Sequence, residues 1–430
     1  MRRRQFLRSV GGALGTMILA PSYASASTPA SFAQACSAAA GESSFWRLVR
    51  SQFLLPQDYA YLNTGGLGAS PYMVTDKVKR MMDSEETYPD AGHKMDDWLE
   101  IKSKCAPYFG SGCKKEELAF TSTATEGINI VINGLPMARG DEVIISTHEH
   151  VALKIPLLHK MQKDGIVIRT FDPDLKRGLG NVERIEHLIN TRTRLIFISH
   201  ITCTTGQIMP VREIGELAEL KGIWFALDGA QALAQMPVDV KGIKADFYAV
   251  SCHKWMMGPK RTGILYVREG MLDTLSPTVV GAYSDSMNEL AERRLELHPT
   301  AQRYEYGTQN DALLYGLREA ADFVSIISVE RIWSYDRDLA ERFYRGLQEL
   351  PGVEVLTPEE EQYRSAMITF RFKDRANRSL SHELTRRRLR VRDVSEAHLD
   401  GIRVSFHVYN NEEEVERLLS EVGKMARTAV

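Results

Sequence analysis

The stretch Phe247-Tyr-Ala-Val-Ser-Cys-His-Lys254-Trp255 decides the fold, because it joins a short apolar run to a lysine. A run of this length is typical of a buried strand in a parallel sheet. Ligands in such sheets bind beyond the carboxyl ends of the strands, so Lys254 stands where a ligand would lie. A lysine amine that burial keeps partly neutral can form a Schiff base. An exposed loop lysine is the alternative, and the surrounding motifs have to decide between the two.

Similar apolar runs recur upstream and downstream of Lys254 and alternate with stretches of helical spacing. This alternation predicts βαβ units and an α/β fold with a largely parallel sheet covered by helices on both faces. The predicted strands are Glu142–Ser146, Val167–Phe171, Leu195–Ser199, Trp224–Leu227, Phe247–Ser251 and Gly263–Val267.

The pattern changes after about residue 311. A helical stretch from Leu313 to Leu350, broken near Ser328, leads to strand-like runs at Ala366–Phe372 and Ile402–Phe406 and to a helix beginning near Asn411. We therefore expect a smaller α+β domain here. The predicted organisation is an export signal over 1–26, an N-terminal arm over 27–60, a large domain over 61–310 and a small domain over 311–430.

Length and charge limit the partners. The chain has 430 residues, which predicts two lobes, and its net charge of −2 argues against nucleic acid or an anionic membrane surface as the main partner. The densest basic stretch, Arg386 to Arg392, is interpreted as a solvated face.

The first residues have the features of an export signal. Arg3-Arg4-Gln5-Phe6-Leu7 precedes a weakly apolar run from Val10 to Ala20 and a small-residue cleavage site near Ala26. Paired arginines before Phe-Leu resemble a twin-arginine signal, which carries folded proteins out of the cytoplasm. The alternative is a disordered basic start. The signal predicts a periplasmic enzyme without a stable membrane anchor.

The cysteines do not form a recognisable framework. Their number is five, and no Cys-x-x-Cys motif occurs, so neither a disulfide scaffold nor a structural zinc site is expected. Cys105 and Cys113 are candidates for one bridge that spacing alone cannot decide.

Polar residues gather at the predicted carboxyl ends of the strands. Asp228 ends an apolar strand, where a carboxylate can pair with a protonated ring nitrogen; capping a following helix is the alternative. Thr123 and Glu126 have the spacing of a capping box, and a helix start of this kind can bind phosphate. The His148-Glu149-His150 spacing could also indicate a metal site. We expect no metal, because no third ligand lies near the two histidines in the sequence. An aromatic ring stacked on a flat heterocycle is the preferred interpretation.

Together these segments resemble the class-V aminotransferase family, which has the fold-type-I architecture and uses pyridoxal 5′-phosphate (PLP). The resemblance runs from about Tyr61 to the C-terminus and includes the cysteine-desulfurase-like and isopenicillin-N-epimerase-like branches. Its motifs are Thr123–Asn129, Glu149–Ala152, Asp228–Gln231, Ser251–Trp255, Gly307-Thr308 and Arg403–Asn410.

The resemblance implies roles for individual residues. Lys254 would form the Schiff base and move the α-proton, Asp228 would bind the pyridine nitrogen, and His150 would stack on the ring. It also implies a mainly parallel sheet of seven strands and a homodimer with shared active sites. Gln231 would contact the phenolic oxygen of PLP. Asn63 and Arg403 would contact the substrate, and Arg403 would bind the substrate carboxylate. The implied phosphate contacts are Ala124, Thr125, Ser251, His253 and the partner subunit's Thr308.

Two departures from the family narrow the expected chemistry. Cysteine desulfurases need a cysteine on a loop of the C-terminal lobe, and no cysteine follows Cys252, so we expect a different reaction. Cys203 stands where many relatives have asparagine, which puts one amide contact in doubt. The resemblance therefore implies transamination or a related α-carbon reaction on an amino acid. The predicted twin-arginine export suggests that the substrate is an amino group of an exported peptide or siderophore precursor. Epimerisation, a lyase reaction and a non-catalytic PLP-binding module are the alternatives.

Overall fold

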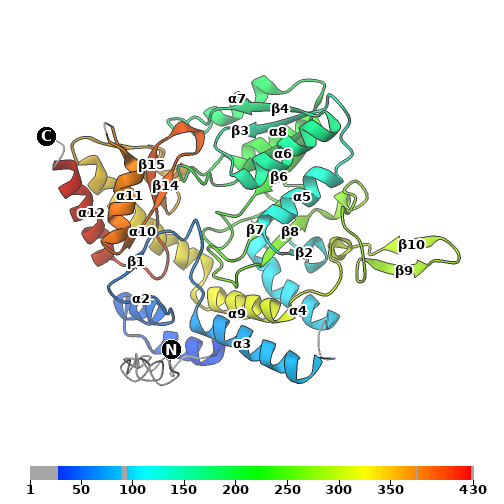
Figure 1. The fold of residues 1–430 in the computed structure, drawn as a ribbon, viewed down its shortest axis with the longest axis horizontal. Coiled ribbons are helices and arrows are strands. Elements are labelled where there is room, and N and C mark those ends of the chain that lie inside the picture. The colour runs from blue at the N-terminus through cyan, green and yellow to red at the C-terminus, as the bar shows by residue number, and fades with distance from the viewer. Residues whose placement is uncertain (1–27, 90–93, 374, 428–430) are drawn as a thin grey trace, which may run out of the picture.

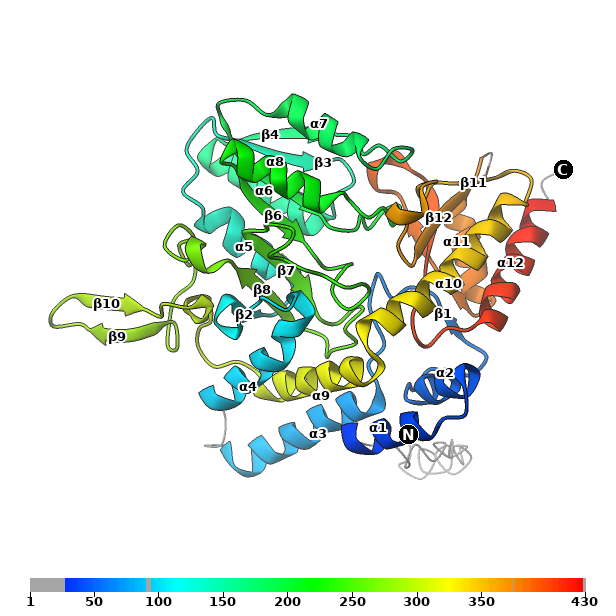
Figure 2. The same ribbon diagram turned by 180° about the vertical axis from the view of Figure 1, so that it is seen from behind.

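The structure is a computed structural model that describes residues 28–89, 94–373 and 375–427. The predicted export signal over 1–26 lies outside these residues. Figures 1 and 2 show a large lobe around a central sheet, a smaller lobe at the C-terminal end, and N-terminal helices along one side of both.

The central sheet has seven strands in the order β2-β8-β7-β6-β5-β3-β4. β8 runs antiparallel to both of its neighbours, and the other neighbouring strands are parallel. The strand order reverses between β3 and β5, which is where ligands of open α/β sheets bind. The strands are β2 (Leu118–Thr121), β3 (Glu142–Ser146), β4 (Val167–Phe171), β5 (Thr193–Ser199), β6 (Trp224–Asp228), β7 (Phe247–Ser251) and β8 (Gly263–Val267).

Both faces of the central strands of this sheet are buried, as the apolar runs predict, whereas edge strand β4 is mostly exposed. In β7, Phe247 and Ala249 pack into one apolar cluster, whereas Tyr248 and Val250 pack into another on the opposite face. This alternation follows from the two-residue period of a strand. The first cluster includes α5 (Ala124–Gly134) and α6 (Val151–Asp164); the second includes α4 (Met95–Cys105), α8 (Val211–Lys221) and α9 (Asp311–Ile327). The remaining helices of this lobe are α3 (Tyr72–Thr87) and α7 (Gly180–Leu188).

All six predicted strands are present, and the prediction of a mainly parallel sheet is confirmed. β2 is the strand that the sequence did not reveal. It has four residues, and the charged segment Lys115–Glu117 directly before it obscures its apolar pattern.

The C-terminal lobe is α+β, as expected. Its antiparallel sheet has the order β11-β12-β15-β14, and its core includes residues of α10 and α12. The break near Ser328 is real: Ser328 has φ of 74° and separates α9 from α10. Strand β1 joins this lobe by pairing with β13, so Ala60 and Leu62 lie in its core. The elements are β1 (Ala60–Tyr61), α10 (Val329–Gln348), β11 (Val353–Val355), β12 (Met367–Phe372), α11 (Asn377–Arg386), β13 (Leu389–Arg390), β14 (Arg392–Val394), β15 (Gly401–Ser405) and α12 (Glu412–Arg427).

Two further features lie outside the sheets. Helices α1 (Pro29–Ala38) and α2 (Glu42–Ser51) pack on the body through buried side chains, among them Phe45 and Val49. Strands β9 (Asp285–Glu289) and β10 (Arg294–Leu297) form a hairpin that projects from the large lobe (Figure 1). Among the described helices, none is both long and apolar enough to cross a membrane.

A short loop after β5 joins the two lobes. Gly206 O accepts hydrogen bonds from Ser365 N at 3.1 Å and Ser365 Oγ at 2.8 Å. Thr369 Oγ1 donates to Thr204 O at 2.7 Å. Gly206 has φ of 72°, and a Cβ at this position would lie 2.2 Å from Met367 O. The loop therefore fits against β12 only because residue 206 is glycine.

Gly206→Ala is expected to destabilise the protein by about 2–4 kcal/mol, because a left-handed alanine costs about 1 kcal/mol and the forced displacement adds about 1–3 kcal/mol. Gly222→Ala is the matched control: Gly222 has φ of 66°, and a methyl group added there would meet nothing within 4 Å, so only the first cost applies. Urea denaturation of both variants measures the difference. Equal losses would contradict the close approach at Gly206.

Candidate active site

A solvent-open cavity of about 220 Å³ lies at the carboxyl ends of β6 and β7. Its wall combines the large lobe, the loop after β1 and the sheet of the small lobe. The residues that line it are Gly65, Gly66, Thr123, Ala124, Thr125, His150, Ala152, Cys203, Asp228, Ala230, Gln231, Ser251, His253, Lys254, Arg392 and Arg403.

Lys254 lies in this cavity, just beyond the end of β7. Burial lowers the pKa of its amine, while the carboxylate of Asp228 acts in the opposite direction. The adjacent His253 has a pKa lowered to about 4 by burial and by the charge of Lys254, so its ring is neutral near pH 7. The geometry rules out an exposed loop lysine and gives Lys254 the desolvated setting that amine chemistry requires.

Asp228 is buried at the end of β6 and faces the same cavity. Its Oδ1 accepts a hydrogen bond from Ala230 N at 2.9 Å, which shapes a turn and caps no helix. Gln231 completes this side: its amide donates to Gly65 O at 2.9 Å and accepts from Trp255 Nε1 at 2.9 Å. These bonds fix the Gln231 side chain at the cavity wall.

Helix α5 begins at the cavity. Thr123 caps it, and Ala124 N donates to Ser251 Oγ at 3.0 Å, while Thr125 is exposed beside them. The partial positive charge of this helix end suits an anion such as phosphate. The predicted capping box is only half right, because the Glu126 carboxylate accepts from Ser122 N and Ser122 Oγ, both at 2.6 Å.

His150 lines the cavity as the N-cap of α6, where its Nδ1 accepts from Ala152 N at 3.2 Å. The ring of His148 instead pairs with Thr204 Oγ1 at 3.0 Å. Burial and the charge of Lys254 lower the pKa of His150. Within the described part of the chain, no three His, Cys, Asp or Glu residues are grouped to hold a metal ion.

Arg403 is 1% exposed and projects into the cavity from β15. Its Nη1 donates to Cys203 O at 2.6 Å and its Nη2 to Asn63 Oδ1 at 3.1 Å. Asn63 thus supports Arg403, while Gly65 and Gly66 form the adjacent cavity wall. Cys203 lines the cavity as well, and burial raises the pKa of its thiol.

Arg392 corrects one sequence-based interpretation. It belongs to the basic stretch that we expected to be a solvated face, yet it lines the cavity and forms an ion pair with Glu396. The reason is strand geometry: β14 pairs with β15 in a register that sets Arg392 opposite Arg403. Arg387 and Arg388 do form surface ion pairs, so the interpretation holds for them.

Glu149 is a further polar residue that the motifs did not reveal as functional. It is buried behind Asp228, where it accepts from Ser146 Oγ at 2.5 Å and from Ser199 N at 2.9 Å. Ser199 lies directly beside Asp228 in the sheet. Burial raises the pKa of Glu149 to about 7, although these hydrogen bonds act against the shift.

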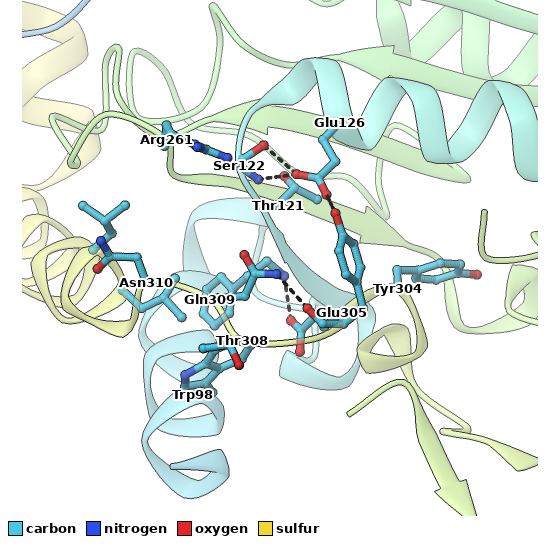
Figure 3. Close-up of a pocket in the computed structure, with 14 residues that line it drawn as sticks. Trp98, Thr121, Ser122, Glu126, Arg261, Tyr304, Glu305, Thr308, Gln309 and Asn310 are labelled. Carbon is cyan, nitrogen blue, oxygen red and sulfur yellow. Dashed lines mark hydrogen bonds between the residues drawn. The ribbon is translucent and has the colours of Figure 1, made fainter. Parts of the chain in front are cut away.

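Thr308 lies apart from the Lys254 cavity, in a second cavity beside Trp98, Gln309 and Asn310 (Figure 3). There Glu126 also accepts a hydrogen bond from Tyr306 OH at 3.2 Å. Thr308 therefore does not reach the cavity of its own chain, and its contact with the phosphate of a partner subunit stays a prediction. Cys105 and Cys113 are free thiols, as are the other three cysteines.

Glu149→Gln tests the buried carboxyl. The folded pKa of about 7 exceeds the ordinary value, so the folded protein holds a proton that the unfolded chain releases as the pH rises. The stability contributed by this bound proton is fully present below the pKa of about 4.3 in the unfolded chain. It is lost as the pH rises through the pKa of Glu149 in the folded protein. The unfolding free energy of the wild type is expected to fall by about 2 kcal/mol relative to Glu149→Gln between roughly pH 5 and pH 8. Urea titrations across that range measure it, and a constant difference would refute the assignment.

Comparison with known proteins places this geometry in a family. A family model described as "Aminotransferase class-V" matches residues 90–418. An isopenicillin N epimerase from Streptomyces clavuligerus is 28% identical over 390 residues, which cover 87% of this chain and 96% of the relative. A cysteine desulfurase from Escherichia coli is 31% identical over 343 residues, which cover 76% and 82% respectively.

Solved structures agree with this result. The apo structure of a cysteine desulfurase from Thermococcus onnurineus NA1 has a TM-score of 0.78 at 26% identity, covering 88% of this chain and 98% of that one. A C-DES mutant with glycine covalently linked to its PLP cofactor has a TM-score of 0.80 at 24% identity, covering 87% and 98%. The chain therefore belongs to the class-V aminotransferase family of PLP-dependent enzymes.

Proposed function

We propose that this enzyme acts at the α-carbon of an amino acid, or of an amino group on an exported peptide or siderophore precursor, by transamination or a related reaction. The observation that carries the proposal is the position of Lys254, Asp228 and Arg403 around one cavity. Epimerisation and a lyase reaction would use the same three residues and are the alternatives.

The cavity fits PLP. His253 Nδ1 is buried without a hydrogen-bond partner, which marks a place for a polar group of a ligand. Asp228 would hold the pyridine nitrogen, Gln231 the phenolic oxygen, and His150 the ring face. Ala124 N, Thr125, Ser251 and His253 would hold the phosphate. When bound, PLP supplies an electron sink for the charge left by loss of a bond at the α-carbon.

The chain's own residues would then bind the substrate and move its proton. Because burial lowers the pKa of Lys254, a larger fraction of its amine is neutral and able to accept the α-proton. Arg403 would hold the substrate carboxylate, since a guanidinium matches it with two parallel hydrogen bonds. Cys203 and Asn63 fix the guanidinium in place, so the α-carbon would be presented to Lys254 in one orientation.

We further propose that the reaction differs from cysteine desulfuration. Relatives named cysteine desulfurases are 28–31% identical to this chain, so the distinction rests on the cysteines alone. No cysteine follows Cys252 in the sequence. Among the described residues that line the cavity, Cys203 is the only cysteine, and it comes from the large lobe.

Export by the twin-arginine route and assembly as a homodimer complete the proposal. The paired arginines at Arg3 and Arg4 support export. The position of Thr308, outside the cavity of its own chain, supports a site shared between subunits.

Lys254→Ala is expected to abolish both the visible absorbance band of the purified protein and amine turnover, because the Schiff-base amine is lost. Lys260→Ala is the matched control: Lys260 lies in the same loop, is also affected by burial, and bonds Gly68 O at 2.9 Å. Absorbance spectra and mass spectrometry of candidate amines measure the two effects. A Lys254→Ala protein that keeps the band would contradict the assignment, and a Lys254-dependent band without turnover of any amine would indicate a binding module.

Incubation with L-cysteine tests the distinction from desulfurases. We expect no alanine above the level of Lys254→Ala, because no thiol of the small lobe is available to accept sulfur. Addition of a keto acid is expected to sustain turnover of a substrate amine if the reaction is transamination. Catalytic release of alanine from cysteine would overturn the distinction.

A further inference from the structure

Two arginines on neighbouring strands of the small-lobe sheet line the active-site cavity side by side. Arg392 and Arg403 are directly opposed in the antiparallel pair of β14 and β15, and both line the cavity. Opposed residues project from the same face of a sheet, and like charges there destabilise it. Burial, and then the charge of Arg392, lower the pKa of Arg403 to about 10, so the Arg403 guanidinium is still charged near neutral pH. The sheet thus tolerates a repulsion that a bound anion would relieve.

The deeper arginine has no salt-bridge partner among the described residues, and the Glu396 carboxylate acts on it only from beyond salt-bridge distance. Arg403 bonds Cys203 O and Asn63 Oδ1, which are neutral, and its Nε is buried without a hydrogen-bond partner. No carboxylate of the described residues forms a salt bridge with it. A buried cation with neutral partners is costly, and one carboxylate of a ligand would compensate it.

The outer arginine holds a carboxylate that can be exchanged. Arg392 Nη2 bonds Glu396 Oε1, and the side chains of the two residues are 26% and 16% exposed. The second oxygen, Glu396 Oε2, is buried without a hydrogen-bond partner. Glu396 belongs to the connection between β14 and β15, so a carboxylate of the chain itself pairs with an arginine that lines the cavity.

The remaining charges do not cancel this excess. Of the residues that line the cavity, Arg392 and Arg403 are the arginines, and Asp228 is the one carboxylate. In the proposed function Asp228 faces the cofactor ring, so the part of the cavity left for the substrate is lined by cations.

We propose that Arg403 and Arg392 together select an acidic α-amino acid, whose side-chain carboxylate replaces Glu396 at Arg392. The inference rests on the proposed function, which assigns the α-carboxylate to Arg403. Glu396 neutralises Arg392 when no acidic substrate is bound. Binding then exchanges one ion pair for another, and a neutral side chain cannot drive this exchange.

The test uses dicarboxylates that lack an amine, so that they bind without reacting. Calorimetric titration of the PLP-loaded protein compares glutarate and succinate with the monocarboxylates pentanoate and butyrate. The wild type is expected to bind the better dicarboxylate at least about tenfold more tightly than its monocarboxylate counterpart, since a charge-assisted pair is added. Arg392→Leu is expected to remove this preference and leave monocarboxylate affinity within about twofold.

Three further variants sharpen the result. Arg388→Leu is the matched control, because Arg388 belongs to the same basic stretch but pairs with Asp58 on the surface. It is expected to bind every probe as the wild type does. Glu396→Gln is expected to tighten dicarboxylate binding alone, because it weakens the competing pair. Arg392→Lys keeps the charge and replaces Arg392→Leu if that variant fails to fold, with a partial preference expected.

Two outcomes would overturn the proposal. Equal losses for dicarboxylates and monocarboxylates in Arg392→Leu would place both arginines on the same carboxylate. No change for either would leave Arg392 as a structural partner of Glu396. The absorbance of each variant gives its PLP content and separates these results from failure of the proposed function. Loss of PLP counts against the proposed function. A dicarboxylate preference in PLP-loaded protein that turns over no amine supports the arginine pair alone.

Discussion

The site depends on a carboxylate that is almost completely buried from solvent at the end of an apolar strand. Asp228 is 5% exposed, and its Oδ1 is bonded by a single backbone amide, that of Ala230. A buried anion is costly unless a cation or a strong donor faces it. Asp228 lines the same cavity as Lys254, and its carboxylate raises the pKa of the lysine amine against the effect of burial. The surrounding sheet therefore presents one negative charge to the cavity.

Most of the large lobe could be predicted because its central strands are buried on both faces, which leaves nearly uninterrupted apolar runs in the sequence. The residues of the cavity that follow these strands could be found for the same reason. Asp228, Ser251 and Lys254 lie at carboxyl ends, and parallel strands bring such ends to one edge. The resemblance to a family then supplied roles that spacing alone does not give.

The rest could not be predicted because it depends on register and on contacts between distant segments. In the sequence, Arg392 is one charge among several in a basic stretch. Only the strand pairing that sets it opposite Arg403 shows that it lines the cavity. Glu149 accepts a hydrogen bond from Ser199 N, 50 residues away, and no local pattern connects the two residues. Thr308 lies outside the Lys254 cavity of its own chain, and no local pattern in the sequence reveals that separation.

The hydrogen bond between Asn63 and Arg403 joins positions 340 residues apart. During synthesis the N-terminal partner leaves the ribosome long before the C-terminal one, so Lys254 emerges before the pocket that surrounds it can close. Tight capture of the cofactor must then follow translation of nearly the whole chain. A protein truncated anywhere before β15 would present its lysine in an incomplete pocket, and release of a finished chain becomes the step that creates a working site.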